Sequence, residues 1–227
     1  MIIDKKYTNQ KKCRIYLVDD HPIFRHGLMQ LINNEEDMTV CGDAENAFDA
    51  LNQIKTIKPD LLIVDISLKD RSGIELIQDI KLYNTKIPIL VLSMHEESFY
   101  AKRVLKLGAK GYIMKAETYE SVINAIRQVL KGKIYLSDNI ADGILHELVD
   151  GTLDNTLASP VDTLTNRELE VFQLIGKGNG TRQIAKTLNL SIYTINTYKE
   201  RIKTKLNLSD ASELVQNAIR WIEFENK

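Results

Sequence analysis

Residues 59–73 read PDLLIVDISLKDRSG, and this stretch decides the fold of the N-terminal half of the chain. Pro59 precedes a continuous apolar run, where its missing N–H costs least, and the run ends at the carboxylate of Asp65. A short apolar run without alternation is typical of a strand that is covered on both faces. Residues 61–64 are therefore predicted to form an interior strand with Asp65 at its carboxyl end.

Four similar apolar runs and five helical patterns surround this strand. The other predicted strands are 14–18, 38–41, 87–92 and 111–114, and the predicted helices are 23–32, 47–57, 74–82, 99–107 and 119–130. Gly108 and Gly132 follow the last two helices as stop signals. This alternation predicts an α/β fold, a doubly wound five-stranded parallel sheet with helices on both faces.

The second half of the chain shows helical patterns and no strand pattern. A capping box of Thr165 and Glu168 opens the first helix, and Ser191 is the expected N-cap of the third. The predicted helices are about 164–175, 182–188, 192–206 and 210–222. Two short helices joined by a tight turn indicate a helix-turn-helix in an all-α domain.

The domain boundaries follow from these patterns. We expect an N-terminal domain at 11–133, a linker at 134–160 and a C-terminal domain at 161–227. Residues 140–149 predict a short helix of one or two amphipathic turns within the linker, and the sequence DGTLDNTLASP after them is rich in turn-forming residues.

Charge is distributed unevenly along a chain of ordinary soluble composition. Residues 163–209 carry eight basic and three acidic side chains, a net charge of +5 that leaves −6 for the rest. A basic segment attached to an acidic domain is typical of nucleic-acid binding. We see no membrane-length apolar run and no signal peptide, and we expect Cys13 and Cys41 to be buried, reduced thiols. A cytoplasmic location is the expectation.

Polar residues collect where the predicted strands end. The carboxyl ends of four strands carry Asp19 with Asp20, then Asp65, then Ser93, then Lys115. Ligand sites of doubly wound sheets lie at this edge. Crowded carboxylates repel one another unless a cation sits among them, and oxygen ligands with few carboxylates favour Mg²⁺. The sequence therefore predicts a magnesium site at which a carboxylate attacks a phosphoryl group.

These residues resemble the receiver domains of response regulators, which have a flavodoxin-like sheet. Besides 59–73, the resemblance rests on VDDHP at 18–22, VLS at 91–93 and GYIMK at 111–115, and it covers about 13–132. It implies that Asp65 is the phosphoacceptor, with Lys115 and Ser93 acting on the phosphoryl group and Tyr112 reorienting as Ser93 moves. The implied magnesium ligands are Asp19, Asp20, Asp65 and the Ser67 carbonyl. We expect His21 to pack at the helix start.

Two departures from many receiver domains leave the lifetime of the phosphate open. Ser67-Leu68-Lys69 replaces the common Met-Pro after the phosphoacceptor, and Ala116 replaces the proline that commonly follows the lysine. A cis peptide bond before a residue other than proline costs about 3 kcal/mol, so we expect a trans bond between Lys115 and Ala116.

Residues 164–208 resemble the LuxR-type output domain of the NarL/FixJ subfamily. Ile195, Tyr198, Ile202 and Leu206 should face the core, so the opposite face of that helix should enter the major groove. The Asn196 amide can form two hydrogen bonds with adenine. Glu200 can either accept a hydrogen bond from the cytosine amino group or form an ion pair with Lys203. The predicted DNA-binding residues are Arg182, Thr194, Asn196, Thr197, Lys199, Glu200, Arg201 and Lys203. Many relatives carry Lys and His where this chain has Asn196 and Tyr198, so sequence preference is not transferable.

The resemblance implies a two-component response regulator, not an enzyme beyond its own phosphorylation and dephosphorylation. Its implied partners are a sensor histidine kinase, double-stranded DNA and a second copy of itself, with RNA polymerase a candidate and no membrane. In the last helix Leu214, Val215, Ala218, Ile219 and Ile222 form a stripe that suits either a protomer interface or packing within the domain.

The sequence disfavours three other classes of protein. Haloacid-type phosphatases place two aspartates two residues apart after one strand, whereas Asp19 and Asp20 are adjacent. A flavodoxin-like cofactor protein would have a phosphate-binding loop after the first strand, and none is present. A helix-turn-helix that binds protein instead of DNA is disfavoured by the basic segment.

Overall fold

The structure is a computed structural model that describes residues 12–68, 71–84, 86–94, 97–149 and 160–225. The chain divides into two compact units, Met1–Asp142 and Gly143–Lys227, and each is described by itself. The division falls within the helix α6, Asp138–Val149. This segment forms one continuous helix, whereas the sequence predicted only one or two helical turns in this region. The termini 1–11 and 226–227 and most of the turn-rich stretch after α6 lie outside the described residues.

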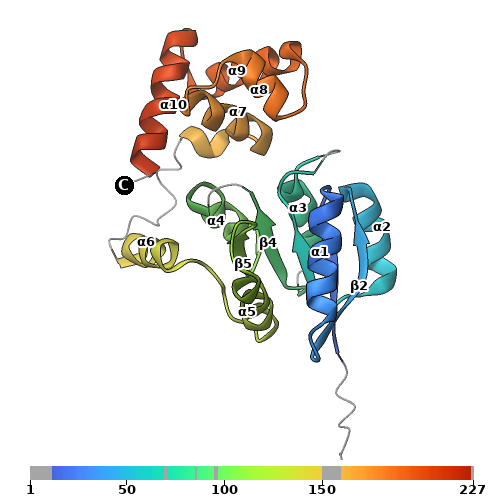
Figure 1. The fold of residues 1–227 in the computed structure, drawn as a ribbon. Helices are drawn as coiled ribbons and strands as arrows, with labels where there is room; N and C mark the ends of the chain where they lie inside the picture. The colour runs from blue at the N-terminus through green and yellow to red at the C-terminus, as the bar shows by residue number, and fades with distance from the viewer. Residues whose placement is uncertain (1–11, 69–70, 85, 95–96, 150–159, 226–227) are drawn as a thin grey trace, which may run out of the picture. The chain divides into compact units, whose positions relative to one another are not determined.

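The N-terminal unit is built on the predicted parallel sheet (Figure 1). Its strands lie in the order β2-β1-β3-β4-β5, so β1 and β3 are central and β2 and β5 are edges. The strands are β1 Cys13–Val18, β2 Met38–Ala44, β3 Leu61–Val64, β4 Ile89–Ser93 and β5 Gly111–Met114. Two of them, β3 and β5, have the predicted bounds, and the others differ by one to three residues at an end.

Five helices alternate with the strands. They are α1 Pro22–Asn33, α2 Ala47–Ile57, α3 Gly73–Tyr83, α4 Glu97–Lys106 and α5 Tyr119–Leu130. The predicted bounds of α2 and α5 are confirmed, whereas the other three differ by one or two residues at their ends. Gly108 and Gly132 adopt φ angles of 93° and 80°, the left-handed region in which glycine commonly ends a helix.

Both faces of the sheet are buried, as the continuous apolar runs indicated. On one face, alternate strand residues pack against α1 and α5; this cluster includes Ile15, Leu17, Ile63, Leu92 and Ile113, with Ile32 from α1 and Ile126 from α5. The intervening residues, among them Tyr16, Leu62, Val91 and Tyr112, are equally buried on the other face, where α2 and α4 contact the sheet. This double cover fixes the strand ends at which the polar residues lie.

The C-terminal unit is helical. A short 3-10 helix, η1 Pro160–Thr163, is followed by α7 Asn166–Gly176, α8 Thr181–Thr187, α9 Ile192–Leu206 and α10 Ala211–Glu225. The capping box is confirmed, since Thr165 accepts from the Glu168 backbone and Glu168 accepts from the Thr165 backbone. The buried core contains Leu169, Phe172, Ile184, Ile195, Ile202, Leu214 and Ala218.

The turn between α8 and α9 is fixed by backbone geometry. Asn189 has a φ of 54°, and the Leu190 N–H donates to the Ala185 carbonyl over 2.9 Å. A left-handed residue with this bond pattern ends a helix abruptly. Ser191 then caps α9 by accepting from the Thr194 N–H at 3.0 Å, which confirms the predicted N-cap. The two helices thus form a helix-turn-helix.

Three smaller expectations have mixed outcomes. Cys13 and Cys41 are free thiols, but both are only half-buried, so the expectation of buried thiols is wrong. The reason is their position at the beginning of β1 and in the edge strand β2. The bond between Lys115 and Ala116 is trans, as expected. Among the described residues, no helix is long and apolar enough to cross a membrane.

Candidate functional site

The central strands bring Asp65 next to Asp19. The Asp65 N–H donates to the Val18 carbonyl over 2.9 Å, which places the first residues after β1 and β3 side by side. Both side chains are almost fully buried. Because β1 and β3 flank the point where the strand order reverses, this is the edge at which doubly wound sheets bind ligands.

Lys115 joins these two carboxylates. Its Nζ lies 2.7 Å from Asp65 Oδ2 and 2.7 Å from Asp19 Oδ2, and its side chain has no exposed surface. The Lys115 N–H donates to the Ser93 carbonyl over 2.7 Å, so the ends of β4 and β5 are fixed together. The aromatic ring of Phe24 in α1 lies 4.7 Å from the ammonium. One buried cation therefore offsets only part of the charge of two buried carboxylates.

Burial dominates the acidity of Asp65. Loss of solvent raises the pKa of this carboxyl to about 6, and the negative charge of Asp19 acts in the same direction. The positive charge and hydrogen bond of Lys115 and the Ser67 N–H oppose this rise. A carboxylate held in this way is ionised at neutral pH but poorly solvated, which favours its use as a nucleophile or cation ligand.

The acidic residues form a cluster that fits a divalent cation. Asp19, Asp20, His21 and Asp65 each offer a ligand atom, and these atoms lie within 4.8 Å of one another. Carboxylate oxygens from two strand ends fit Mg²⁺, which binds few protein oxygens and keeps waters, and the Asp20 side chain is 12% exposed. Ser67 is half-buried beside them, and its N–H donates to Asp65 Oδ1 over 3.2 Å.

His21 lies over this cluster, which sequence reasoning missed. Its Nδ1 is 2.8 Å from Asp20 Oδ1, 3.3 Å from Asp19 Oδ1 and 3.8 Å from Asp65 Oδ2. It holds the N-cap position of α1 but makes no side-chain cap, and about half of the side chain is exposed. The expectation that it packs at the helix start is therefore incomplete.

Arg25 is a second residue that sequence reasoning did not single out. Its Nη1 donates to the Asp19 carbonyl over 2.5 Å and its Nε donates to Asp43 Oδ2 over 2.8 Å. The side chain is buried although it is charged, so these bonds hold the loop after β1 in place. Its helical spacing could have indicated burial, because Arg25 lies on the same face of α1 as the buried Leu28 and Ile32.

Ser93 and Tyr112 lie on one face of neighbouring strands. Tyr112 pairs with Val91, two residues before Ser93, so the two side chains project from the same side of the sheet. Both are fully buried. This is the face that α4 covers next to β5.

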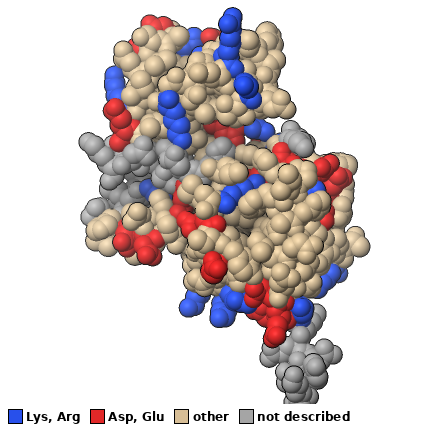
Figure 2. Space-filling model, viewed as in Figure 1, with Lys and Arg blue, Asp and Glu red and all other residues tan. Residues whose placement is uncertain are grey.

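The predicted DNA-reading helix α9 has one buried and one open face. Ile195 and Ile202 are buried, and Tyr198 and Leu206 are half-buried. On the other face Asn196, Glu200 and Arg201 are exposed, Thr197 and Lys203 are half-buried, and Arg182 is exposed on α8. Figure 2 shows Lys and Arg side chains projecting from the surface of this unit.

Several of these side chains already have partners. Lys199 Nζ donates to Thr181 Oγ1 over 2.8 Å, and the Thr194 hydroxyl lies 2.7 Å from the Ser191 hydroxyl at the cap of α9. Lys203 Nζ lies 3.0 Å from Glu200 Oε2, the pairing that the sequence left open against a base contact.

The apolar stripe of α10 is divided between core and surface. Leu214 and Ala218 are buried in the domain, whereas Val215 and Ile219 are 40% and 38% exposed. The ring centroids of Trp221 and Phe172 lie 5.6 Å apart, which ties α10 to α7. Packing within the domain therefore accounts for part of the stripe.

Comparison with known protein families agrees with this architecture. Residues 15–127 match the response regulator receiver domain, and residues 162–218 match the bacterial regulatory proteins of the luxR family. The chain belongs to the two-component response regulators: it joins a receiver domain to a LuxR-type DNA-binding domain and regulates transcription. This assignment argues against the two alternative classes, haloacid-type phosphatases and flavodoxin-like cofactor proteins.

The relatives place it in the NarL/FixJ subfamily. The chain is 35% identical over 211 residues to the oxygen regulatory protein NreC of Staphylococcus epidermidis, covering 91% of this chain and 97% of NreC. It is similar to RcsB from Salmonella enterica serovar Typhimurium bound to promoter rprA with the phosphomimetic BeF3−, with a TM-score of 0.57, 26% identity and coverage of 91% and 98%. A structure of two RcsB dimers bound to two parallel DNAs gives a TM-score of 0.55 at 27% identity, covering 91% of this chain and 97% of RcsB.

Proposed function

We propose that a sensor histidine kinase donates a phosphoryl group to Asp65, and that this controls dimerisation and sequence-specific binding to double-stranded DNA. The observation that carries the proposal is the contact of Lys115 with both Asp65 and Asp19 at the switch point of the sheet. Asp19 shares this lysine partner and these acidic neighbours, but Asp65 is the more deeply buried of the two, with 2% of its surface exposed against 6%.

Each pocket residue has a proposed role. Asp65 Oδ attacks the phosphorus, and the Lys115 ammonium binds an oxygen of the transferring group and offsets its charge. Asp19, Asp20, Asp65 and the Ser67 carbonyl would hold Mg²⁺, which when bound supplies charge neutralisation at the phosphoryl oxygens. The Ser93 hydroxyl donates to the phosphoryl group, and Tyr112 follows its movement.

The output depends on α9 in the major groove. Asn196 is exposed in the N-terminal half of α9, where base edges come closest, and it suits adenine. We assign contacts with phosphate or sugar, which position the helix, to a further set of residues. These are Arg182, Thr194, Thr197, Lys199, Arg201 and Lys203. Glu200 is assigned first to Lys203, because their ion pair is already formed.

A dimer is proposed because one helix reads only a few base pairs. The exposed Val215 and Ile219 on α10 are one candidate contact surface. RNA polymerase is the further partner proposed at a promoter. We place the protein in the cytoplasm, where a regulator can reach both a kinase and chromosomal DNA.

The phosphoacceptor is tested by intact mass. With Mg²⁺ and acetyl phosphate, the protein should gain one phosphoryl mass, and Asp65→Ala should gain none. Glu36→Ala, which removes an exposed carboxylate in the loop before β2, is the control and should react like the wild type. A phosphoryl group mapped to another residue contradicts the assignment.

Dimerisation is tested by sedimentation of both forms. Phosphorylation should raise the dimer fraction and the affinity for DNA, and a fragment without residues 1–160 should bind the same DNA without Mg²⁺ or phosphodonor. An unchanged mass distribution together with an inert fragment would favour a constitutive dimer that reorients.

A further inference from the structure

The segment after α5 pairs with the outer edge of the sheet. β5 is the last strand in the order, so the side that faces away from β4 would otherwise present unpaired backbone groups. The Tyr112 N–H donates to the Tyr135 carbonyl over 3.0 Å, and the Tyr135 N–H donates to the Lys110 carbonyl over 3.0 Å. Residues 134–137 therefore act as a one-bridge parallel extension of the sheet beside β5.

Gly111 permits this close approach. A Cβ atom at Gly111 would lie 2.9 Å from the Tyr135 carbonyl oxygen, 3.0 Å from Leu90 Cδ1 and 3.1 Å from the Tyr135 Cβ. A side chain at this position would push the segment outward. The pairing of Tyr135 with β5 therefore requires glycine at position 111.

A second anchor joins the segment to α4. The Ser137 N–H donates to Glu97 Oε1 over 3.0 Å, and Glu97 is the first residue of α4. The next residue, Asp138, begins α6. The segment thus touches β5 and α4 of the receiver domain and is followed in the chain by α6, within which the N-terminal unit ends.

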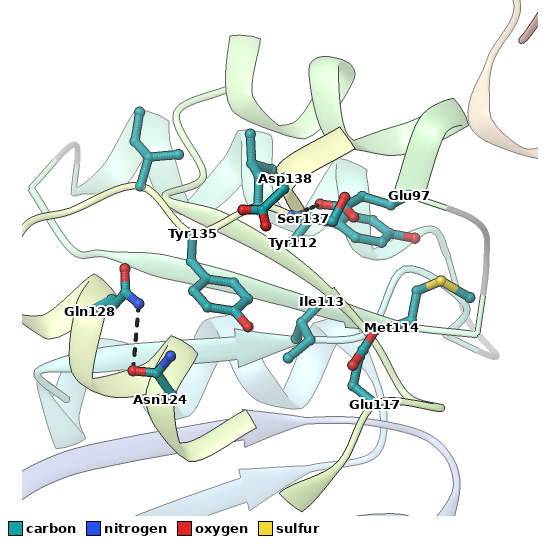
Figure 3. A pocket seen from close by; sticks show the side chains of 12 residues that line it. Glu97, Tyr112, Ile113, Met114, Glu117, Asn124, Gln128, Tyr135, Ser137 and Asp138 are labelled. Atoms are coloured by element: carbon teal, nitrogen blue, oxygen red, sulfur yellow. Dashed lines mark hydrogen bonds between the residues drawn. The ribbon is translucent and has the colours of Figure 1, made fainter. Parts of the chain in front are cut away.

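The attachment lies along a cavity, and Tyr135 also packs against the hydrophobic cluster of the receiver domain. A cavity of about 460 Å³ lies beneath it, and in Figure 3 the side chains of Glu97, Tyr112 and Ser137 lie together with Asp138 beside them. Ile134, the apolar residue before the bridge, is 58% exposed. Three hydrogen bonds and the half-buried side chain of Tyr135 make a small contact, which opens locally well before the domain unfolds.

Carboxylates crowd the same cavity. Glu97, Glu117 and Asp138 all line it. Together with loss of solvent, which is the largest cause, their negative charges raise the pKa of the Tyr135 hydroxyl. Like charges around one cavity disfavour a tighter closure, which keeps the attachment easy to release.

The anchors belong to the elements that a phosphoryl group at Asp65 would move. Ser93 ends β4 four residues before Glu97, and Tyr112 on β5 contributes both its buried ring and its backbone N–H. A Ser93 that is drawn toward the phosphoryl group pulls on the first turn of α4. That movement would separate Glu97 from Ser137.

We propose that residues 134–137 form a releasable edge strand: phosphorylation withdraws Glu97 from Ser137, the segment leaves β5, and the tether to the DNA-binding domain lengthens. The coupling rests on the proposed phosphorylation of Asp65. Four released residues add about 13 Å of reach when extended. The receiver thereby controls how far its output domain can travel.

Amide hydrogen exchange followed by NMR on the full chain tests the release. After reaction with acetyl phosphate and Mg²⁺, the amides of Tyr112, Tyr135 and Ser137 should exchange about tenfold faster or more, because these contacts open locally. The amide of Ile63 in the interior strand β3 should not change. Intact mass is measured on the same sample. No phosphoryl mass contradicts the proposed function and this coupling with it, whereas unchanged exchange in fully phosphorylated protein contradicts the coupling alone.

Two variant pairs test the anchors without phosphorylation. Glu97→Ala should speed exchange at Tyr135 and Ser137, and Glu97→Gln, which keeps an oxygen acceptor, should restore slow exchange. Gly111→Ala should also release the segment, whereas Gly27→Ala, on α1 with nothing within 4 Å of the added atom, should not. Unchanged Tyr135 exchange in both Glu97→Ala and Gly111→Ala, with Ile63 still protected, would overturn the proposal.

Discussion

A Cβ atom on Gly73 would lie 1.8 Å from the carbonyl oxygen of Asp65. The backbone at the start of α3 is thus in direct contact with the backbone of the residue that we propose as phosphoacceptor. The Gly73 N–H also donates to the Ile66 carbonyl over 2.7 Å, and Ser72 forms an isolated bridge with Ser67. Ile66 and Ser67 are therefore held against the start of α3, next to the Asp65 carboxylate of the pocket.

Gly73→Ala should therefore disturb both stability and phosphorylation. The added methyl meets backbone atoms that have no room to rotate away, so the free energy of unfolding should fall by about 3 kcal/mol or more. Urea unfolding and the rate of phosphoryl gain measure the two effects. Gly27→Ala is the control, since a helical glycine in open space gains about 0.5–1 kcal/mol from alanine. Equal stabilities of the two variants would refute the close contact.

The raised pKa of Asp65 predicts a pH dependence of stability. Between about pH 4 and pH 6 the folded protein keeps a proton that the unfolded chain has already released, so stability falls as the pH rises through this window and is level above it. Without Mg²⁺, the wild type should lose about 1 kcal/mol relative to Asp65→Asn between pH 5 and pH 7.5. Urea unfolding of both proteins at the two pH values measures the difference, and parallel pH profiles would contradict it.

Base recognition and phosphate binding should separate in two variants of α9. Asn196→Ala should cost about 1–3 kcal/mol on the cognate site and little on random DNA, because it removes a bidentate base contact. Arg201→Ala should weaken binding to both DNAs similarly and lower the salt slope by about 1. Titrations at several salt concentrations measure both effects. If Asn196→Ala weakened the two DNAs equally, the assigned face would be wrong.

The ion pair of Glu168 and Lys205 predicts acid sensitivity in the C-terminal domain. Lys205 Nζ donates to Glu168 Oε2 over 2.6 Å, and burial raises the pKa of Glu168 less than its bonds to Lys205 and Thr165 lower it. The stabilisation is therefore present above the ordinary glutamate pKa and is lost as the pH falls through the lowered value. Lys205→Ala should cost about 1–3 kcal/mol at pH 7 and less in acid, because it leaves a buried carboxylate unpaired. Urea unfolding of the 161–227 fragment at both pH values measures this, and a cost independent of pH would argue against the pair.

Much of the architecture was predictable because its signals are local. The continuous apolar run of β3 required cover on both faces, and the N-caps Thr165 and Ser191 precede helices that begin where expected. The convergence of Asp19, Asp65 and Lys115 also followed from sequence, because the carboxyl ends of parallel strands meet at one edge.

Other features depend on contacts that leave no pattern in the chain. The sequence placed His21 at the start of α1 but not above the carboxylates, since the direction of a side chain at a helix cap is set by tertiary structure. The pairing of Tyr135 with β5 is a single bridge, too short to show alternation. The close approach of Gly73 to Asp65 exists only once β3 and α3 are packed.

The packing of Trp221 on Phe172 has a practical consequence. The chain contains one tryptophan, and it lies in α10 of the DNA-binding domain. Indole fluorescence of the full protein therefore originates from that domain alone, whereas far-ultraviolet circular dichroism reports the helices of both. Unfolding one unlabelled sample while recording both signals separates the stability of the output domain from that of the receiver, and a shift between the two curves on phosphorylation measures how strongly the domains depend on each other.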